Sequence, residues 1–491
     1  MRIKALTICI AAAAGSLMQA CSFIPEFRQP AMPVPAQWHS GAVYSDTGDN
    51  ALQQIGWKDF FIDPALQELV DIALQNNRDL RTAALQVESY QALYRIQRAD
   101  LFPTLDVTGS GSRQRLPADL SPAGRSTISS NYNIGLGTTA WELDFFGRIR
   151  SLQEQALNQY LASDEARRSV QISLVTSVAI GWLSYCSDLE QLQLTNSTLR
   201  SYIESYELMQ MRANAGTASD LDVAQAKSTV DSARSIQAQY MRLIAMDRNA
   251  LEELLGTAIP EDILKQRSME GSLLKDIPVG LPADLLVRRP DIRQAEYQLR
   301  AANANIGAAR AAFFPRISLT TSAGTASDEL SGLFDAGSGA WSFMPQISVP
   351  IFTAGRLSAN LDYAELQKDI NVAFYEKTIQ TAFREVSDGL AQRKTYALQL
   401  LAEQDLVDTN QHYLNLANER YDSGVDNYLT VLDAQRVLFS ARQQQILTRL
   451  NKLSTEITLF KALGGGITVD EPESLNTRTI ATGSTSTEPA L

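Results

Sequence analysis

The chain is short of the residue types that most often carry chemistry. Its 491 residues include 2 histidines and 3 cysteines. His39 and His412 stand alone, so a zinc site or a serine, histidine and aspartate triad lacks the partners it needs. Cys9, Cys21 and Cys186 are too few and too scattered for a disulfide framework. We therefore expect no catalytic residue, no metal site and no cofactor.

Positive charge is scarce as well. The formal net charge is -12 at pH 7, and the lysines and arginines do not gather in any one stretch. Nucleic-acid binding needs a basic patch that draws in the phosphate backbone. We therefore expect no nucleic-acid partner.

The N-terminus has the pattern of a secretory signal peptide over residues 1–20. Two basic residues precede an apolar run from Ala5 to Ala14, which is too short to span a bilayer. The segment LMQAC then ends at Cys21 and resembles a bacterial lipoprotein processing site. We predict a lipid on Cys21 and a proline-rich, extended tether over residues 21–63. The alternative is ordinary cleavage, which leaves Cys21 free.

The rest of the chain contains one pattern twice. A shift of 212 residues lays ADLFPTLDVTGSG on AAFFPRISLTTSA, and a shift of 208 lays Gly147 on Gly355 and Gly216 on Gly424. Such self-similarity indicates a tandem duplication. We predict a first repeat over 64–256, an equatorial linker over 257–282, a second repeat over 283–464 and a partly disordered tail over 465–491.

Each copy changes from helix to strand at a Phe-Pro pair. An apolar seam at steps of three and four runs from Ala295 to Phe313, as in a helix packed on another helix. Phe314 precedes Pro315 and is pushed out of the α region, and strand-like alternation follows. Pro103 marks the same junction in the first copy, after a helix predicted from Pro64 to Leu101.

A β-hairpin follows each junction, over residues 103–145 and 315–352. In the first hairpin we predict a strand from Thr104 to Gly111 and a polar loop from Arg113 to Ser130 before the return strand. In the second hairpin, apolar and polar side chains alternate along the return strand, with Trp341, Phe343, Ile347, Val349 and Ile351 on one side. This alternation is typical of a transmembrane barrel with lipid outside and water inside. The alternative is a half-buried sheet in a soluble domain.

Two helices complete each copy. The first is predicted at about 60 residues, roughly 90 Å long and so too tall for a membrane, and the second at about 35. The first ends at Gly216 or Gly424, where glycine allows the left-handed turn that reverses a helix. Along the last helix an apolar residue recurs every seven positions, at Leu432, Phe439, Ile446, Leu453 and Phe460, which is a coiled-coil pattern.

Two hairpins supply four strands per chain, and an open four-stranded sheet cannot exist in lipid because its edges would be unpaired. Barrels have about eight strands or more, and in an eight-stranded barrel the side chains nearly fill the interior. We therefore predict that three chains pool their strands into a twelve-stranded barrel with a pore.

The runs GLPADLLVRRPDIRQAEYQLRAANANIGAARAAFFPRISL and YDSGVDNYLTVLDAQRVLFSAR, with the repeat and its two Phe-Pro junctions, resemble the outer membrane factor family of trimeric channel-tunnels. The likeness is to the lipoprotein branch that serves resistance-nodulation-division efflux pumps, and it covers about Trp57 to Gly464. It implies a mixed α and β fold: a homotrimer whose twelve-stranded barrel in the Gram-negative outer membrane continues into a twelve-helix periplasmic tunnel. It also implies docking through a periplasmic adaptor onto an inner membrane pump, outer membrane lipid around the barrel, and no enzymatic activity.

The resemblance further implies a periplasmic gate at the helix turns. The turns at Gly216 and Gly424 match the adaptor-docking tips of the family, and Asp433, with Arg436 one turn on, would line the closed end. The alternative is that Asp433 and Arg436 form an ordinary exposed pair at i, i+3.

A latch is also implied, in which Tyr421 on the second tip reaches Asp222 on the first. The sequence departs from some members here, because Asp426 stands where they have an arginine and Thr430 where they have a further aspartate. The number of latches is therefore left open.

Three functions fit these expectations. The first is a passive exit duct for drugs or small toxic compounds, driven by a partner pump, and the lipoprotein signal and the RRPDIRQAE motif favour it. The second is the same duct in type I polypeptide secretion. The third is a structural coiled-coil lipoprotein without a pore.

Overall fold

The chain is described in a computed structural model that places residues 22–35, 38, 41–44, 56–121, 124–265, 269, 273–275 and 289–465. The predicted signal peptide, Cys21, much of the linker and the tail from residue 466 lie outside these residues. The chain divides into two compact units. Unit 1 contains Arg78–Val170, Leu286–Arg384 and the N-terminal segment, and unit 2 contains Gln37–Asn77, Gln171–Leu285 and Glu385–Leu491.

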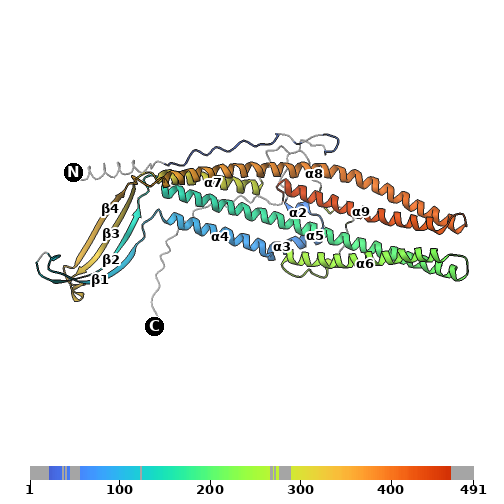
Figure 1. Cartoon of the computed structure of the whole chain (residues 1–491), viewed down its shortest axis with the longest axis horizontal. Helices are drawn as coiled ribbons and strands as arrows, with labels where there is room; N and C mark the ends of the chain where they lie inside the picture. Colours follow the sequence, from blue (N-terminus) through green and yellow to red (C-terminus); the bar gives the residue numbers. More distant parts are fainter. Residues whose placement is uncertain are drawn as a thin grey trace, which may run out of the picture. The chain divides into compact units, whose positions relative to one another are not determined.

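Both copies have the same order of elements (Figure 1). The first contains α4 (Arg78–Ala99), β1 (Asp106–Leu116), β2 (Thr127–Glu142), α5 (Arg148–Asn214) and α6 (Asp220–Leu255). The second contains α7 (Pro290–Ala311), β3 (Arg316–Ser327), β4 (Gly339–Ser348), α8 (Arg356–Asp422) and α9 (Tyr428–Ala462). Helices α5 and α8 have 67 residues each, somewhat more than the sequence predicts, and both pass from unit 1 into unit 2.

The helix predicted from Pro64 to Leu101 is interrupted at Asn77. Helix α3 (Pro64–Asn76) ends there, Asn77 has an extended backbone with ψ 133°, and α4 begins at the next residue. No proline or glycine marks this break. Its cause is tertiary, because the buried Asn77 side chain donates a hydrogen bond to the Leu254 carbonyl at 2.9 Å and α3 packs against α6 within unit 2.

The four strands form one antiparallel sheet in the order β1-β2-β3-β4. The two hairpins join where β2 pairs with β3, with Tyr132 opposite Ser327. The sheet leaves β1 and β4 as its two edges. The two hairpins of one chain therefore form a single four-stranded sheet.

The predicted polar loop from Arg113 to Ser130 is strand for four residues at each end, so the prediction was wrong at both ends. Arg113 pairs with Ser130, and the ladder continues to Leu116 opposite Thr127. Antiparallel pairing is made by main-chain groups, so polar side chains with no core to face can still extend a strand. The connection that remains is 117–126.

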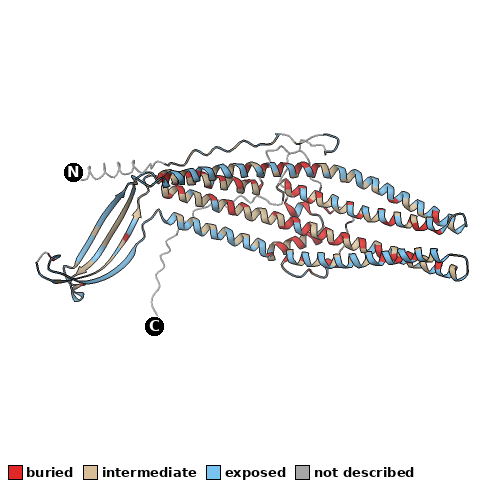
Figure 2. Ribbon diagram, viewed as in Figure 1, coloured by how far each residue is buried: buried red, intermediate tan, exposed pale blue. Residues whose placement is uncertain are grey.

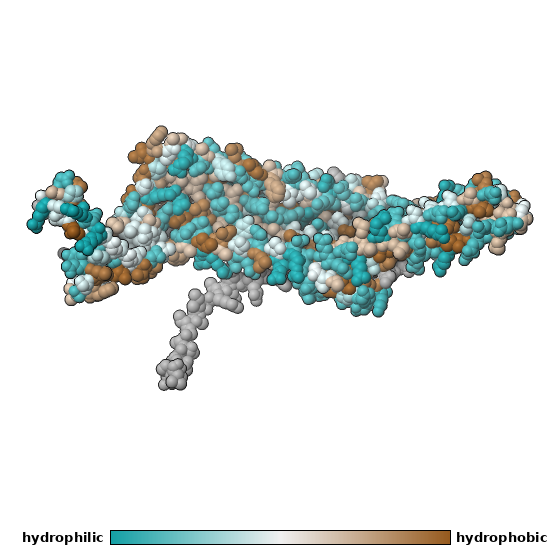
Figure 3. All heavy atoms as spheres, turned by 60° about the horizontal axis from the view of Figure 1, so that its bottom comes forward, coloured by the Kyte–Doolittle hydropathy of each residue, from teal (hydrophilic) through white to brown (hydrophobic). Residues whose placement is uncertain are grey.

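The register sorts the side chains of the sheet onto two faces. One face is largely apolar and carries Val107, Ile134, Leu136, Ile317, Leu319, Trp341, Phe343 and Ile347. The other carries Thr108, Asn133, Ser318, Ser322, Ser342, Gln346 and Ser348. Trp341 is 80% exposed in the single chain, and Figure 2 shows almost no buried residue in the sheet. In Figure 3 brown, hydrophobic surface lies along the strands and teal covers their loop end.

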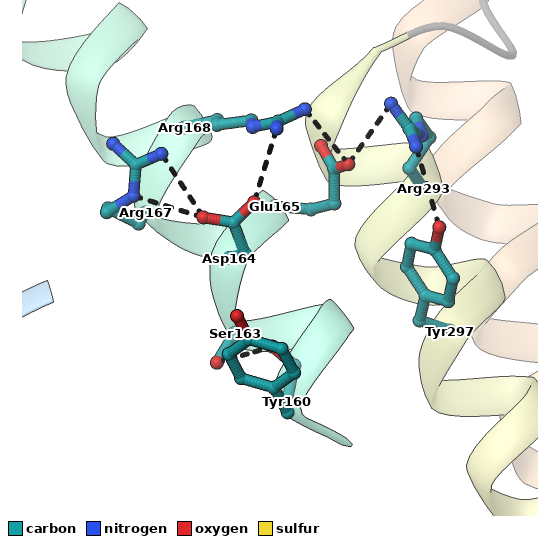
Figure 4. A network of polar contacts seen from close by, with 8 residues as sticks. All are labelled: Tyr160, Ser163, Asp164, Glu165, Arg167, Arg168, Arg293 and Tyr297. Atoms are coloured by element: carbon teal, nitrogen blue, oxygen red, sulfur yellow. Dashed lines mark hydrogen bonds and ion pairs between the residues drawn. The ribbon is translucent and has the colours of Figure 1, made fainter. Parts of the chain in front are cut away.

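Within unit 1 the helices lie in the order α8, α7, α5, α4 (Figure 1). A buried carboxylate ties two of them together: Glu165 on α5 is 3% exposed and accepts from Arg293 of α7 at 3.1 Å and from Arg168 at 3.3 Å (Figure 4). Burial raises the pKa of Glu165, and the two arginines oppose that rise. Arg293 also donates to the Tyr297 hydroxyl on its own helix at 3.5 Å. Its ion pair with Glu165 fixes α7 against α5.

Residues 22–35 of the predicted tether pack on unit 1. Phe23 stacks on Phe314 with ring centroids 4.5 Å apart, the Asn303 side chain donates to the Pro25 carbonyl at 2.8 Å, and Gln29 donates to the Tyr375 hydroxyl at 2.9 Å. A Cβ on Gly307 would lie 2.6 Å from Ile24, so α7 has no room for a side chain there. Residues 22–35 are therefore extended, as the prolines predict, but they are held along α7 and α8. The end of the predicted tether is not extended, because Trp57–Phe60 form the short helix α2 in unit 2.

Unit 2 has its own apolar core. Phe60 stacks on Phe460 of α9 at 4.0 Å, and the predicted seven-residue pattern of α9 is buried at four of its five positions, with Leu453 partly exposed. Cys186 is buried in this unit, as expected of a small packed residue. Among the described helices, α5 alone has a stretch apolar enough to cross a membrane, and 56% of that stretch is buried inside the chain, which accounts for its composition.

Candidate functional site: the two helix tips

Each long helix reverses at a glycine in the left-handed region. Gly216 has φ 73° and Gly424 has φ 72°. In both turns the residue after glycine donates its N–H back to an arginine carbonyl, from Thr217 to Arg212 at 2.8 Å and from Val425 to Arg420 at 2.9 Å. These bonds satisfy carbonyls that the end of a helix would leave unpaired. The two tips therefore share one backbone geometry.

The side chains around the first tip close it with a capping box. Ser219 accepts from the Asp222 N–H at 3.2 Å, and the Asp222 carboxylate accepts from the Ser219 N–H at 3.0 Å and from its hydroxyl at 2.7 Å. These hydrogen bonds lower the pKa of Asp222, because they favour its charged form. Asp222 is thus engaged in starting α6.

The second tip uses an ion pair and an asparagine cap. Both nitrogens of the Arg420 fork donate to Asp426, at 2.7 and 3.0 Å, and the Asn427 side chain accepts from the Thr430 N–H at 3.4 Å. The hydrogen bond from Arg420 lowers the pKa of Asp426. Asp426 therefore neutralises an arginine within its own turn.

Tyr421 connects the two tips. Its hydroxyl accepts a hydrogen bond from Arg212 of α5, whose guanidinium lies 4.8 Å from the centre of the tyrosine ring, and its O–H points to the Met209 sulfur at 3.9 Å. The ring also lies 5.4 Å from that of Tyr428. Burial raises the pKa of Tyr421, and Arg212 acts against that rise.

An apolar cluster beneath this contact joins all four helices that form the tips. Its buried members are Met209, Ala226, Ala417, Tyr428, Val431, Leu432 and Ala434. Because these come from α5, α6, α8 and α9, separating the two tips within a chain would expose apolar surface to water. The tips are held together by packing, with the polar contact of Tyr421 at its border.

The predicted latch between Tyr421 and Asp222 is not formed within the described chain. Arg212 and Met209 occupy the tyrosine hydroxyl, and Asp222 caps α6, although its charge is near enough to raise the pKa of Tyr421. Arg212 was not identified from the sequence as the partner of Tyr421. The repeat held the signal, since Arg212 and Arg420 each stand four residues before a tip glycine.

The predicted gate residues form a local pair in the single chain. Arg436 donates to Asp433 at 2.8 Å across one turn of α9, with side chains 74% and 45% exposed. This is the ordinary exposed pair that the spacing i, i+3 allows. That Asp433 and Arg436 line the closed end of a tunnel around a three-fold axis stays a prediction.

The two Phe-Pro junctions lie between helix and strand, as predicted. Pro103 follows α4 and precedes β1, and Pro315 stands between α7 and β3. At the second junction Phe314 is sandwiched, with Phe23 on one side and Phe146 on the other at 5.0 Å. The junction is thereby fixed by residues from three distant parts of the sequence.

The fold and these tips can be compared with known proteins. Residues 69–257 and 281–465 match the outer membrane efflux protein family. The chain belongs to this family. It is 59% identical over 460 residues to the solvent efflux pump outer membrane protein SrpC of Pseudomonas putida, covering 93% of this chain and 97% of SrpC.

Solved structures agree. A membrane protein from Pseudomonas aeruginosa is 47% identical with a TM-score of 0.86, covering 90% of this chain and 100% of that one. The open state of the MtrE outer membrane channel of Neisseria gonorrhoeae is 37% identical with a TM-score of 0.80, covering 91% and 98%.

Family membership confirms the predicted resemblance, the mixed helical and β fold, and the location in the outer membrane of a Gram-negative bacterium. The protein is an efflux channel, and the tips and the sheet are parts of a transport protein. Within the residues that the structure describes, no group of three or more His, Cys, Asp or Glu could hold a metal ion.

Proposed function

We propose that this chain is the outer membrane channel-tunnel of a tripartite efflux pump, works as a homotrimer, and gives drugs or small toxic compounds such as solvents passive exit to the cell exterior. The observation that carries the proposal is the sheet. It is apolar on one face, polar on the other and open at both edges, an arrangement that suits lipid only when other chains close it into a barrel. The chain performs no catalysis in this scheme.

The helices of unit 1 support a trimer independently. Exposed apolar residues lie on α4 (Leu85, Leu93 and Ile96) and on α8 (Tyr363, Leu366 and Ile370), each at least 51% exposed. These two helices lie on opposite sides of α5 and α7 (Figure 1). Two different surfaces that cover each other around an axis form a closed ring. Three such chains supply the twelve strands and twelve helical strands of the tunnel.

The partners follow from the same scheme. A passive duct needs a driven pump, which we take to be of the resistance-nodulation-division type in the inner membrane, and a periplasmic adaptor that docks on the tips at Gly216 and Gly424. Cys21 carries the lipid that anchors the N-terminus. The names of relatives such as SrpC, a solvent efflux pump protein, support small apolar compounds as substrates.

Conductance tests the channel. Purified protein in a planar bilayer should give discrete single-channel steps, and a strain lacking the chain should lose resistance to solvents and drugs and regain it from a plasmid. A coiled-coil lipoprotein without a pore would give neither steps nor resistance. Loss of an exported polypeptide with unchanged drug resistance would favour type I secretion.

The gate has a sharper test, because the tips offer a matched control. Tyr421→Phe and Arg212→Ala each remove the hydrogen bond between the tips, and they should raise resting conductance alike. Asp433→Ala with Tyr421→Phe should raise it further and make cells leak large antibiotics. Arg420→Ala breaks an ion pair that stays within one tip and should leave conductance unchanged. Wild-type conductance in the Asp433→Ala, Tyr421→Phe variant would place the gate elsewhere.

Lipidation is tested by labelling. Cys21→Ala should abolish incorporation of radiolabelled palmitate yet leave trimers in the outer membrane, because the barrel itself holds the protein there. If the trimer is lost as well, the lipid is also needed for insertion.

A further inference from the structure

Two groups of opposite charge lie at the loop end of the sheet. The basic rim consists of Arg113, Arg115 and Arg125, on β1 and just before β2. The acidic rim consists of Asp328, Glu329 and Asp335, in the connection from β3 to β4. All six are exposed, and in the described part of the chain no ion pair involves any of them. Their side chains bond to neighbouring serines: Arg115 donates to Ser126 at 2.9 Å, and Glu329 accepts from Ser331 at 3.5 Å.

The two rims belong to opposite edges of the sheet. The basic rim is carried by edge strand β1, and the acidic rim leads into edge strand β4. If chains pool their strands, β1 of one chain lies beside β4 of the next, about 4.8 Å away. The acidic rim of one chain would then stand next to the basic rim of its neighbour.

The rims also lie at the same level of the sheet. The ladders place Gly111, Tyr132 and Ser327 on one rung. Arg113 stands two residues beyond Gly111, and the acidic connection begins directly after Ser327. Strand β4 starts two rungs lower, with Gly339 opposite Thr325. The last part of β1 therefore outruns β4 and would lie beside the acidic connection instead of beside a strand.

Main-chain pairing alone does not choose this arrangement. A strand edge can pair at several registers, and a slip by one residue would turn every apolar side chain into the lumen. Like charges brought side by side are unfavourable, and opposite charges favour one register and one partner. A pair of basic and acidic rims on the two edges supplies that preference.

We propose that the basic rim of each chain binds the acidic rim of the next chain, and that this contact sets which edges pair and in which register when the barrel closes. The proposal rests on the trimer proposed above. Its partner is a second copy of this chain. The competing occupant is a phosphate-bearing lipid of the outer leaflet, since Arg113 and Arg115 share the apolar face with Val107.

Charge reversal and rescue test the contact. Arg113→Glu with Arg115→Glu should lower the temperature at which the detergent-solubilised trimer separates into monomers, and so should Asp328→Arg with Glu329→Arg. The four substitutions together should restore the wild-type temperature. In about 1 M salt the dissociation temperatures of the variants and of the wild type should lie closer together, because salt at that concentration screens exposed charges beyond about 3 Å. Destabilisation without rescue would overturn the proposal, and destabilisation confined to membranes containing phosphorylated lipid would assign the arginines to lipid instead.

Cross-linking tests the geometry without relying on stability. Arg113→Cys with Asp335→Cys should join chains into covalent dimers and trimers on oxidation, whereas Arg113→Cys with Ser348→Cys should not, because Ser348 is at the other end of β4. Equal yields from the two pairs would overturn the proposed register. Native mass spectrometry separates this outcome from failure of the trimer: a monomeric wild type would overturn the assembly itself, whereas a trimer without the expected cross-link overturns the rim contact alone.

Discussion

The two copies of the repeat have kept their backbone more closely than their polar contacts. Gly216 and Gly424 make the same turn, and Ser219 and Asn427, at matching positions, both cap the next helix. The charges around them differ, since Arg212 reaches the other tip whereas its counterpart Arg420 binds Asp426. The copies therefore share a backbone, but only the arginine of the first copy bonds to the other tip.

The start of the long helix shows the same divergence. In the first copy Arg148 forms a double hydrogen bond with Glu142, at 2.8 and 2.7 Å, and Arg150 binds Asp144. The matching positions of the second copy keep the first arginine, as Arg356, but have proline and phenylalanine in place of the two acids. One strand-to-helix junction is thus clamped by charge and the other is not.

The helix pairs differ inside unit 2 as well. Between α5 and α6 the carboxyls of Asp188 and Asp247 interact, and burial, with the neighbouring Asp247, raises the pKa of Asp188 to about 6. The matching positions between α8 and α9 are Tyr396 and Thr455, which carry no charge at neutral pH. At these positions α5 and α6 therefore share a titratable contact that α8 and α9 lack.

The largest expected effect concerns the apolar face of the sheet, to which the strands of both copies contribute. Ile347→Arg on β4 and Leu136→Arg on β2 should each cost about 2 to 4 kcal/mol per chain and prevent assembly, because both put a charge into lipid. Ser348→Arg, on the polar face, should assemble and change conductance. Trimer yield in outer membrane fractions checks this, and equal tolerance of Ile347→Arg and Ser348→Arg would mean that the faces are wrongly assigned.

The clamp at the first junction should matter only in that copy. Arg148→Ala should lower the free energy of unfolding by about 1.5 to 3 kcal/mol, since it removes charge-assisted bonds from a partly buried carboxylate. Arg356→Ala, its counterpart, should stay within about 0.5 kcal/mol. Urea unfolding in detergent measures both, and a similar loss in the two variants would show that the clamp adds nothing specific.

The acid pair should make the first copy lose stability as pH rises. Because the folded pKa of Asp188 is raised, its contribution is complete below the unfolded value of about 4 and is lost as pH rises through about 6. Asp188→Asn should therefore stabilise the protein at pH 7 by about 1 kcal/mol, after allowance for solvent screening, and flatten the profile between those values. Tyr396→Phe, the control in the second copy, should keep the wild-type slope.

The smallest effect should be equal in the two copies. Gly216→Ala and Gly424→Ala meet no atom within 4 Å, so the cost comes from the left-handed backbone alone, about 1 kcal/mol each. Thermal unfolding of the two variants should shift by the same amount. A much larger shift at one tip would indicate a contact made only in the assembled trimer.

The sequence predicted the parts of the fold that have a local cause. Proline at residues 103 and 315, glycine at 216 and 424 and the apolar period of α9 each act on a few neighbouring residues, and the structure has the junctions, turns and helices where these predict them. The repeat supplied the two hairpins and so the number of strands per chain, whereas the pairing of β2 with β3 came from the structure.

The parts that failed have distant causes. Asn77 breaks a helix because of a carbonyl 177 residues away, and the polar ends of β1 and β2 form strands because each pairs with the other. At the tips, the partner of Tyr421 is 209 residues away in the chain, and no local pattern chooses Arg212 over Asp222. How copies of the chain assemble also has distant causes, because it depends on which surfaces pair, and no local sequence pattern shows that.

The packing of the N-terminal segment on α7 and α8 has a consequence for the order in which the protein folds. Pro25 and Gln29 are among the first residues of the exported chain, yet their partners Asn303 and Tyr375 follow 278 and 346 residues later. Contacts so distant in sequence form slowly, because a long loop must close first. The end that is made first can therefore take its place only after most of the chain has been exported and the second copy is present.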